Sequence, residues 1–140
     1  MYKRQLGDSV TRLDRIEPEL NEAAVGDPRD TTSPAAMLAD LNALVLGTAL
    51  SAGSRERLAA WLVGCRTGDK RVRAGLPQGW RVGDKTGTGE NGTANDIAVI
   101  WPRQRAPLVL TVYLTGSHIS AGERDATHAQ VARAVAAALD

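Results

Sequence analysis

The carboxy-terminal half of the chain contains three apolar segments joined by short connections, and this pattern constrains the fold most strongly. The segments are residues 80–89 (WRVGDKTGTG), 94–102 (ANDIAVIWP) and 107–115 (PLVLTVYLT). The third segment alternates with the period of two that is typical of a strand, and the second is an almost continuous apolar run, consistent with a strand buried on both faces. Because the connections GENG and PRQRAP are short enough to be hairpin loops, we predict three antiparallel strands in sequence order.

Helical patterns precede these strands. Ser33 at an N-cap and Pro34 at the first helical position predict a helix start, and the helical spacing of apolar residues continues to Gly47. A second helix is predicted to start at Ser54 and to stop at Gly64. The apolar positions of these two helices are Met37, Leu38, Leu41, Leu44, Val45, Leu58, Trp61 and Leu62.

A further helix is predicted after the strands. Ser120 and Glu123 match a capping box, and an Ala-rich segment follows in which Val131, Val135 and Leu139 lie on one predicted helix face. The order of helices, three strands and a final helix favours an α+β fold. A length of 140 residues is enough for one domain with a modest core.

Charge and composition exclude several classes of function. The 17 Lys and Arg residues nearly balance the 16 Asp and Glu residues, so we expect no bulk attraction to nucleic acid or to an anionic membrane. No apolar run approaches the ~20 residues of a membrane helix, and the first ten residues lack the apolar region of a signal peptide. One cysteine and two histidines give no metal-ligand spacing, so neither a metal nor another cofactor is expected.

The rarer apolar residues carry two further expectations. The chain has no Phe, so the three tryptophans, Trp61, Trp80 and Trp101, are expected to anchor the packing. Cys65 follows an apolar helical pattern, and we expect it to be a buried and unreactive thiol.

The segment DKTGTG, from Asp84 to Gly89, places an ammonium group, two hydroxyls and glycine backbone at the end of a predicted strand. Such an edge can bind a carboxylate, and its glycines allow main-chain N–H groups to approach an acyl oxygen. A Gly-rich hairpin with an exposed lysine is the alternative, and these six residues alone favour it slightly.

Residues 11–32 are polar, include Pro18, Gly26 and Pro28, and show no sustained period. This composition predicts a long irregular loop, and loops of that length in compact domains are usually functional or disordered. Its segment RLDRIEPELNEA raises two alternatives, a solvated acidic turn or a general base with a partner. Glu19 is interpreted as a solvated residue.

Together, the loop and the strand resemble the class A family of serine β-lactamases. Penicillin-recognising serine enzymes combine an S-x-x-K helix, an S-D-N loop and a K-T-G strand, and class A members add an E-x-x-L-N loop. Residues 17–21 (EPELN) and 85–87 (KTG) match the last two of these motifs in order. The segments RLDRIEPELN, GDPRDTTSP, GDKTGTG and GTANDIAVIWP extend the resemblance over residues 8–140, which are expected to be a partial catalytic domain.

The resemblance implies an incomplete β-lactamase/penicillin-binding transpeptidase-like fold, with an omega loop and helices before three antiparallel strands and a carboxy-terminal helix. It assigns Glu17 as the base that deprotonates the deacylating water and Asn21 as a second ligand of that water. The bond before Pro18 is expected to be cis. Arg15 and Asp30 are expected to form the ion pair that closes the loop.

On the strand, the resemblance assigns the substrate carboxylate to Lys85, Thr86, Gly87 and Thr88. It also assigns half of the oxyanion hole to the main-chain N–H of Thr88. Arg71 resembles the arginine that some members place behind the lysine. Arg73 is the alternative occupant of that position, and a solvated basic loop is the alternative interpretation of both.

The nucleophile of the family is not found in the 140 residues. No serine is followed by Lys three positions later, and the sequence contains no S-D-N. We therefore expect a truncated class A sequence in which residues 1–7, which show no resemblance, are a junction or an assembly artefact. The isolated chain is expected to fold poorly and not to hydrolyse a chromogenic cephalosporin, because it lacks sheet neighbours and an acyl acceptor.

Two other functions remain open at this stage. A penicillin-binding carboxypeptidase or transpeptidase shares the K-T-G strand and would hold covalent penicillin without turnover. A non-catalytic β-lactam-binding pseudoenzyme would use Lys85, Thr86 and Thr88 for reversible binding. For the complete family member, the resemblance implies a monomer in the periplasm or outside the cell, with a penicillin or cephalosporin as its ligand.

Overall fold

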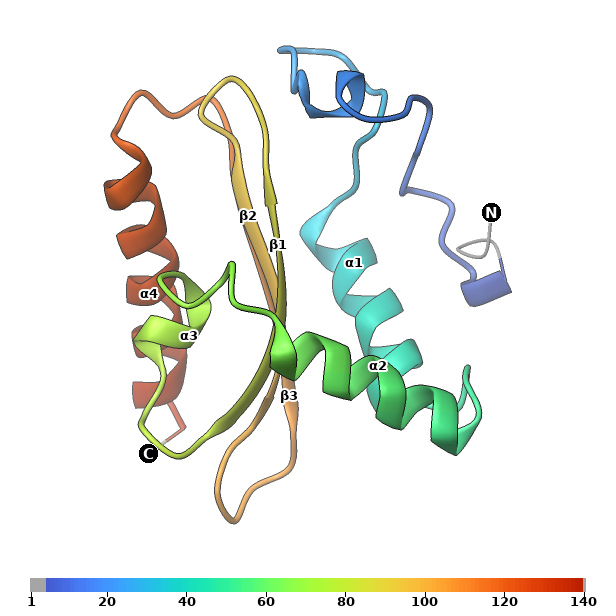
Figure 1. Cartoon of the computed structure of the whole chain (residues 1–140), viewed down its shortest axis with the longest axis vertical. Helices are drawn as coiled ribbons and strands as arrows, with labels where there is room; N and C mark the ends of the chain where they lie inside the picture. The colour runs from blue at the N-terminus through green and yellow to red at the C-terminus, as the bar shows by residue number, and fades with distance from the viewer. Residues whose placement is uncertain (1–4, 140) are drawn as a thin grey trace.

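The computed structural model describes residues 5–139, and three antiparallel strands form the centre of the fold (Figure 1). The strands are β1 (Arg81–Thr88), β2 (Ala94–Trp101) and β3 (Leu108–Leu114), in the order β1-β2-β3. In the register, Val82 is opposite Ile100 and Thr86 is opposite Asp96. The predicted α+β fold and the three sequential strands are therefore confirmed. Of the segment 1–7, residues 1–4 lie outside the described range.

Helices cover both faces of the sheet (Figure 1). The elements before β1 are the 3-10 turn η2 (Glu19–Asn21), α1 (Pro34–Leu41), the π-helical turn η3 (Asn42–Leu46), α2 (Ala52–Gly64) and α3 (Val72–Gly75), and α4 (Ala121–Ala137) follows β3. Ser33 caps α1, accepting a hydrogen bond from the N–H of Ala36, and the run ends at Gly47 as predicted.

Each face of the sheet has its own apolar cluster. On the α1 and α2 side, the cluster contains Leu41, Val45, Ala59, Leu62 and Val99. On the α3 and α4 side, the cluster contains Val72, Val82, Ala98, Ile100 and Ala132. Because β2 contributes to both clusters, its nearly continuous apolar sequence is explained by burial on its two faces.

Helix α4 begins at the predicted capping box of Ser120 and Glu123, and it packs against the sheet and α3 through its small residues. Its buried residues are His128, Ala129, Ala132 and Ala136, whereas Val131 is exposed. A Cβ added to Gly75 would lie 2.0 Å from the carbonyl oxygen of Ala129. Since α3 and α4 approach this closely, only small side chains fit between them, and the alanines rather than the row of Val131, Val135 and Leu139 form this contact.

Three other expectations need correction. The N-cap of α2 is Ser51 rather than Ser54, because the Ser51 hydroxyl accepts the N–H of Ser54. Trp61 is 68% exposed and anchors nothing, whereas Trp80 and Trp101 pack against the apolar clusters. Cys65 is partly exposed because it follows the last residue of α2, where the chain leaves the helix.

The described range 5–139 holds no helix that is long and apolar enough to cross a membrane. Within the same residues, no group of three or more His, Cys, Asp and Glu side chains is placed to hold a metal ion.

Candidate active site

The predicted irregular loop before α1 contains the 3-10 turn η2, and the candidate base, Glu17, lies just before this turn. The bond between Glu17 and Pro18 is cis. The turn brings the Asn21 amide to the carboxylate of Glu17, and Asn21 Nδ2 donates a hydrogen bond to Glu17 Oε2. Glu17 is exposed, as is Glu19. Two polar side chains that lie four residues apart in the sequence are therefore in direct contact.

Ion pairs close this loop at its base. Arg15 Nε donates to Asp30 Oδ2 at 2.6 Å, and the main-chain N–H groups of Asp14 and Arg15 donate to the other carboxylate oxygen of Asp30. The guanidinium group also contacts Glu22, and it lies 3.9 Å from Asp27. The structure thus contains the Arg15–Asp30 pair, which joins the two ends of the loop.

The K-T-G segment lies at the end of strand β1, on the open edge of the sheet. Lys85 is exposed, and its Nζ donates to the carbonyl of Thr86 at 2.6 Å. The Thr86 hydroxyl lies 2.6 Å from the hydroxyl of Thr67. The hydroxyls of Thr67 and Thr86 and the ammonium group of Lys85 therefore lie near the edge of the sheet. Hydrogen-bond donors and a positive charge of this kind are suited to binding an anion.

The loop is attached to the end of this strand. The N–H of Glu90 donates to the carbonyl of Asn21 at 2.8 Å, and a Cβ added to Gly89 would lie 2.7 Å from the same oxygen. Glycine at position 89 therefore allows the backbone of Asn21 to approach the strand. This contact fixes the Glu17–Asn21 pair relative to the K-T-G residues.

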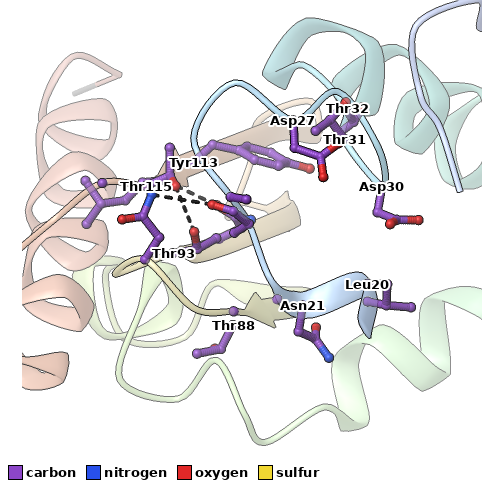
Figure 2. Close-up of a pocket in the computed structure, with 18 of the residues that line it drawn as sticks. Leu20, Asn21, Asp27, Asp30, Thr31, Thr32, Thr88, Thr93, Tyr113 and Thr115 are labelled. Atoms are coloured by element: carbon purple, nitrogen blue, oxygen red, sulfur yellow. Dashed lines mark hydrogen bonds between the residues drawn. The ribbon is translucent and has the colours of Figure 1, made fainter. Parts of the chain in front are cut away.

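A pocket of about 780 Å³ separates the loop from the sheet. Its lining includes Asn21 from η2 and the segment 85–89 from β1, together with Tyr113 from β3. Figure 2 shows Asn21 and Thr88 near one end of the pocket, with Asp27, Thr31 and Thr32 near Tyr113 at the other. Asn21, the partner of the candidate base, and the candidate anion-binding strand thus face a common space.

The structure separates the two candidate arginines. Arg71 is buried; its Nη2 donates to Thr88 Oγ1 at 2.8 Å, and its Nε donates to Asp125 of α4 at 2.7 Å. Arg73 instead pairs with the fully buried carboxylate of Asp84. Arg71 is therefore the arginine behind the K-T-G strand, whereas Arg73 neutralises a buried charge.

Two buried carboxyl groups lie on the α3 and α4 side of the sheet. Asp84 and Asp96 are fully buried, and their positions on β1 and β2 are diagonal neighbours. Burial, together with the smaller effect of the nearby Asp84 carboxyl, raises the pKa of Asp96 to about 7. The folded state therefore binds a proton at Asp96 that the unfolded state releases near pH 4.

This proton makes the stability of the fold depend on pH. Since the folded state binds more protons between about pH 4 and 7, the free energy of unfolding falls as pH rises through this window. We expect Asp96→Asn to be more stable than the parent by about 4 kcal/mol at pH 8 but by only about 1 kcal/mol at pH 4.5, as measured by urea unfolding. An amide cannot ionise, yet its oxygen still accepts the N–H of Val72. Glu19→Gln is the exposed control, and an equal pH slope in Asp96→Asn and the parent would contradict the account.

Comparisons with known proteins identify the family. A model of the β-lactamase enzyme family matches residues 1–139. The chain belongs to this family. A β-lactamase of Proteus vulgaris is 59% identical over 81% of the chain, and β-lactamase CTX-M-6 of Salmonella typhimurium is 53% identical over 96% of it.

Solved β-lactamases place the chain in class A. The structure of an ancestral class A β-lactamase (GNCA) is 66% identical over 98% of the chain, with a TM-score of 0.96. The chain covers 53% of that ancestral protein, 42% of the Proteus vulgaris enzyme and 46% of CTX-M-6. It therefore spans about half the length of the relatives that it matches.

Two residues of this β-lactamase-family chain were missed by the sequence analysis. Thr67 contacts Thr86 from the connection between α2 and α3, and Asp125 holds Arg71 from the first turns of α4. Neither lies in a recognisable motif, and Asp125 is 54 residues from its partner. The roles of Thr67 and Asp125 become visible only in the folded structure, where the segment between α2 and α3 and the helix α4 both contact β1 or its neighbour Arg71.

Proposed function

We propose that this chain supplies the deacylation and carboxylate-binding half of a class A site that hydrolyses β-lactams through a serine acyl-enzyme. The observation that carries the proposal is the Glu17–Asn21 pair, which is fixed to the end of the K-T-G strand by the hydrogen bond from Glu90 to Asn21. The proposal is supported by the pocket that Asn21, the partner of Glu17, and the K-T-G residues line together.

In the proposed reaction, Glu17 accepts a proton from a water molecule that Asn21 also holds, because an amide can both donate and accept hydrogen bonds. The hydroxide attacks the carbonyl carbon of the acyl-enzyme ester. The resulting tetrahedral intermediate collapses, the bond to the serine oxygen breaks, and the proton returns to that oxygen. The products are the ring-opened acid and the free serine.

Binding of the substrate is assigned to the strand. The ammonium of Lys85 and the hydroxyls of Thr86 and Thr88 bind the substrate carboxylate, and Gly87 lets the ligand approach the backbone. The main-chain N–H of Thr88 stabilises the developing oxyanion. Arg71 lies behind this strand, where its guanidinium adds positive potential.

Other residues have a structural role in this proposal. Arg15 and Asp30 join the ends of the omega loop, and Pro18 shapes the backbone next to the base. The acyl-forming serine and its lysine are assigned to the part of the class A fold that this chain does not span. We further propose a location in the periplasm or outside the cell, a monomeric complete protein, and no nucleic-acid partner.

The test joins the 140-residue chain to the part of the ancestral class A β-lactamase that lies outside the matched range; we call this protein the joined domain. The two are 66% identical where they match, so the interface residues of the ancestral half meet similar partners. We expect the joined domain to hydrolyse a chromogenic cephalosporin. Lys85→Ala should raise KM by roughly tenfold or more, since a charged hydrogen bond to the substrate is lost.

The control is the joined domain with the nucleophilic serine of the ancestral half changed to alanine, which should be inactive. A correctly folded joined domain without turnover would contradict the proposal. Covalent penicillin retained for hours without turnover would instead indicate a penicillin-binding enzyme, and reversible binding alone would indicate a binding module.

A further inference from the structure

We propose that Thr67 is a positioning residue that directs the hydroxyl hydrogen of Thr86 toward the substrate carboxylate. The inference rests on the proposed function, because it assumes that Thr86 binds that carboxylate. It concerns a residue outside the K-T-G motif, in the connection between α2 and α3, which comprises residues 65–71.

The central contact joins two hydroxyls. Thr67 Oγ1 lies 2.6 Å from Thr86 Oγ1, a short distance for an O–H···O hydrogen bond, and either oxygen can be the donor. Thr86 lies on β1, whose outer edge pairs with no other strand among the described residues. The partner on this open edge is therefore a side chain of the connection.

The chemistry of the ligand decides the direction of this hydrogen bond. A carboxylate only accepts hydrogen bonds, and a threonine hydroxyl has a single hydrogen to donate. If Thr86 donated that hydrogen to Thr67, it would have none for the ligand. Substrate binding therefore requires Thr67 to donate to Thr86, so that Thr86 can donate to the carboxylate.

A third group supports this direction. Cys65 Sγ lies 3.2 Å from Thr67 Oγ1, and a thiol can donate its S–H to that oxygen. Donation runs from Cys65 to Thr67, then to Thr86 and finally to the ligand. Successive hydrogen bonds in such a chain polarise one another, which strengthens the last bond.

The hydroxyl of Thr88, two residues further along the strand, also accepts a hydrogen bond from the connection. Thr88 Oγ1 accepts a hydrogen bond from Arg71, which cannot itself accept one. Its own hydrogen therefore remains available. Both hydroxyls of the strand accept from residues of the connection, and both then present a hydrogen to an anion at the edge.

The connection is fixed against β1, so Thr67 is held in place despite its exposure. Arg71 also donates to the carbonyl of Gly87 at 3.1 Å. A Cβ added to Gly68 would lie 1.8 Å from the carboxylate of Asp84, so the backbone beside Thr67 packs directly on the strand. Contacts on both sides of Thr67 restrict the positions that its hydroxyl can occupy.

The experiment compares Thr67→Val and Thr67→Ser in the joined domain, with benzylpenicillin and its methyl ester as substrates. We expect Thr67→Val to raise KM for benzylpenicillin roughly three- to tenfold, the loss of one hydrogen bond, with kcat within about twofold. Thr67→Ser should restore the parent KM. The methyl ester lacks the anionic acceptor, so its kinetic constants should be the same in all three proteins.

The readout separates positioning from stability, because a merely structural change would alter both substrates and would not depend on the hydroxyl. Unchanged kinetics of Thr67→Val, or equal losses with acid and ester, would overturn the inference while leaving the proposed function intact. If Thr67→Val does not fold, Thr67→Ala replaces it in the same comparison. A folded but inactive parent would overturn the proposed function, and this inference with it.

Discussion

Glu17→Gln in the joined domain is expected to lower the rate of deacylation by about 10²- to 10⁴-fold, the contribution of a positioned general base. Glutamine has nearly the same shape and can still bond to Asn21, but its amide cannot accept the proton of the attacking water. In the proposed mechanism, the serine and lysine that form the acyl-enzyme lie outside this chain, and acylation does not use Glu17. Stopped-flow measurements with a chromogenic cephalosporin should therefore show a burst of one product per enzyme, followed by very slow turnover.

Glu19→Gln is the matched control for this prediction. Glu19 lies two residues away in the same loop and is also exposed, but it is not the partner of Asn21. Its kinetic constants should stay within about twofold of the parent, since surface substitutions have small effects. Equal losses in the two variants would show that the charge of the loop, rather than the base at position 17, determines the rate.

Arg73→Met is expected to reduce the free energy of unfolding by about 3–5 kcal/mol at neutral pH, because it removes one partner of a buried ion pair. The Arg73 guanidinium contacts the Asp84 carboxylate, which is fully buried, and it also donates to the carbonyl of Val82 at 3.0 Å. Methionine retains an apolar side chain of similar length but leaves the Asp84 charge unpaired. Urea unfolding of the joined domain with and without the substitution measures the loss.

Arg66→Met is the control for the ion pair. Arg66 contacts Asp69 at 3.0 Å, but its side chain is 83% exposed, so its loss should cost no more than about 1 kcal/mol. Arg73→Met combined with Asp84→Asn should recover much of the lost stability, because the unpaired charge is then absent. Similar losses for Arg66→Met and Arg73→Met would contradict the assignment of a buried pair.

The parts of the fold that the sequence predicted are those that depend on local pattern. The three strands follow from residues 80–115, where short connections and strand periods leave few alternatives. The caps at Ser33 and Ser120 follow from hydrogen bonds within one helical turn. The omega loop and the K-T-G strand were found because their residues are contiguous, and in the structure both line one pocket.

The remaining features depend on contacts between distant segments. The buried face of α4 is determined by the close approach of Gly75 to Ala129. The spacing of the valines along the helix gives no indication of this contact. The roles of Arg71 and Arg73 also depend on tertiary contacts. The two arginines are only two residues apart in the sequence, but Arg71 binds Thr88 of β1 whereas Arg73 binds Asp84 of the same strand. Sequence alone supplied both candidates without deciding between them.

The most direct test of the central claim is intact-protein mass spectrometry of the joined domain during its reaction with benzylpenicillin. If this chain carries the deacylating base, Glu17→Gln should accumulate a stable adduct with the added mass of one penicillin, while the parent returns to its free mass as substrate is consumed. An adduct that disappears equally fast in both proteins would contradict the assignment of Glu17, and with it the function proposed for this half of the class A fold.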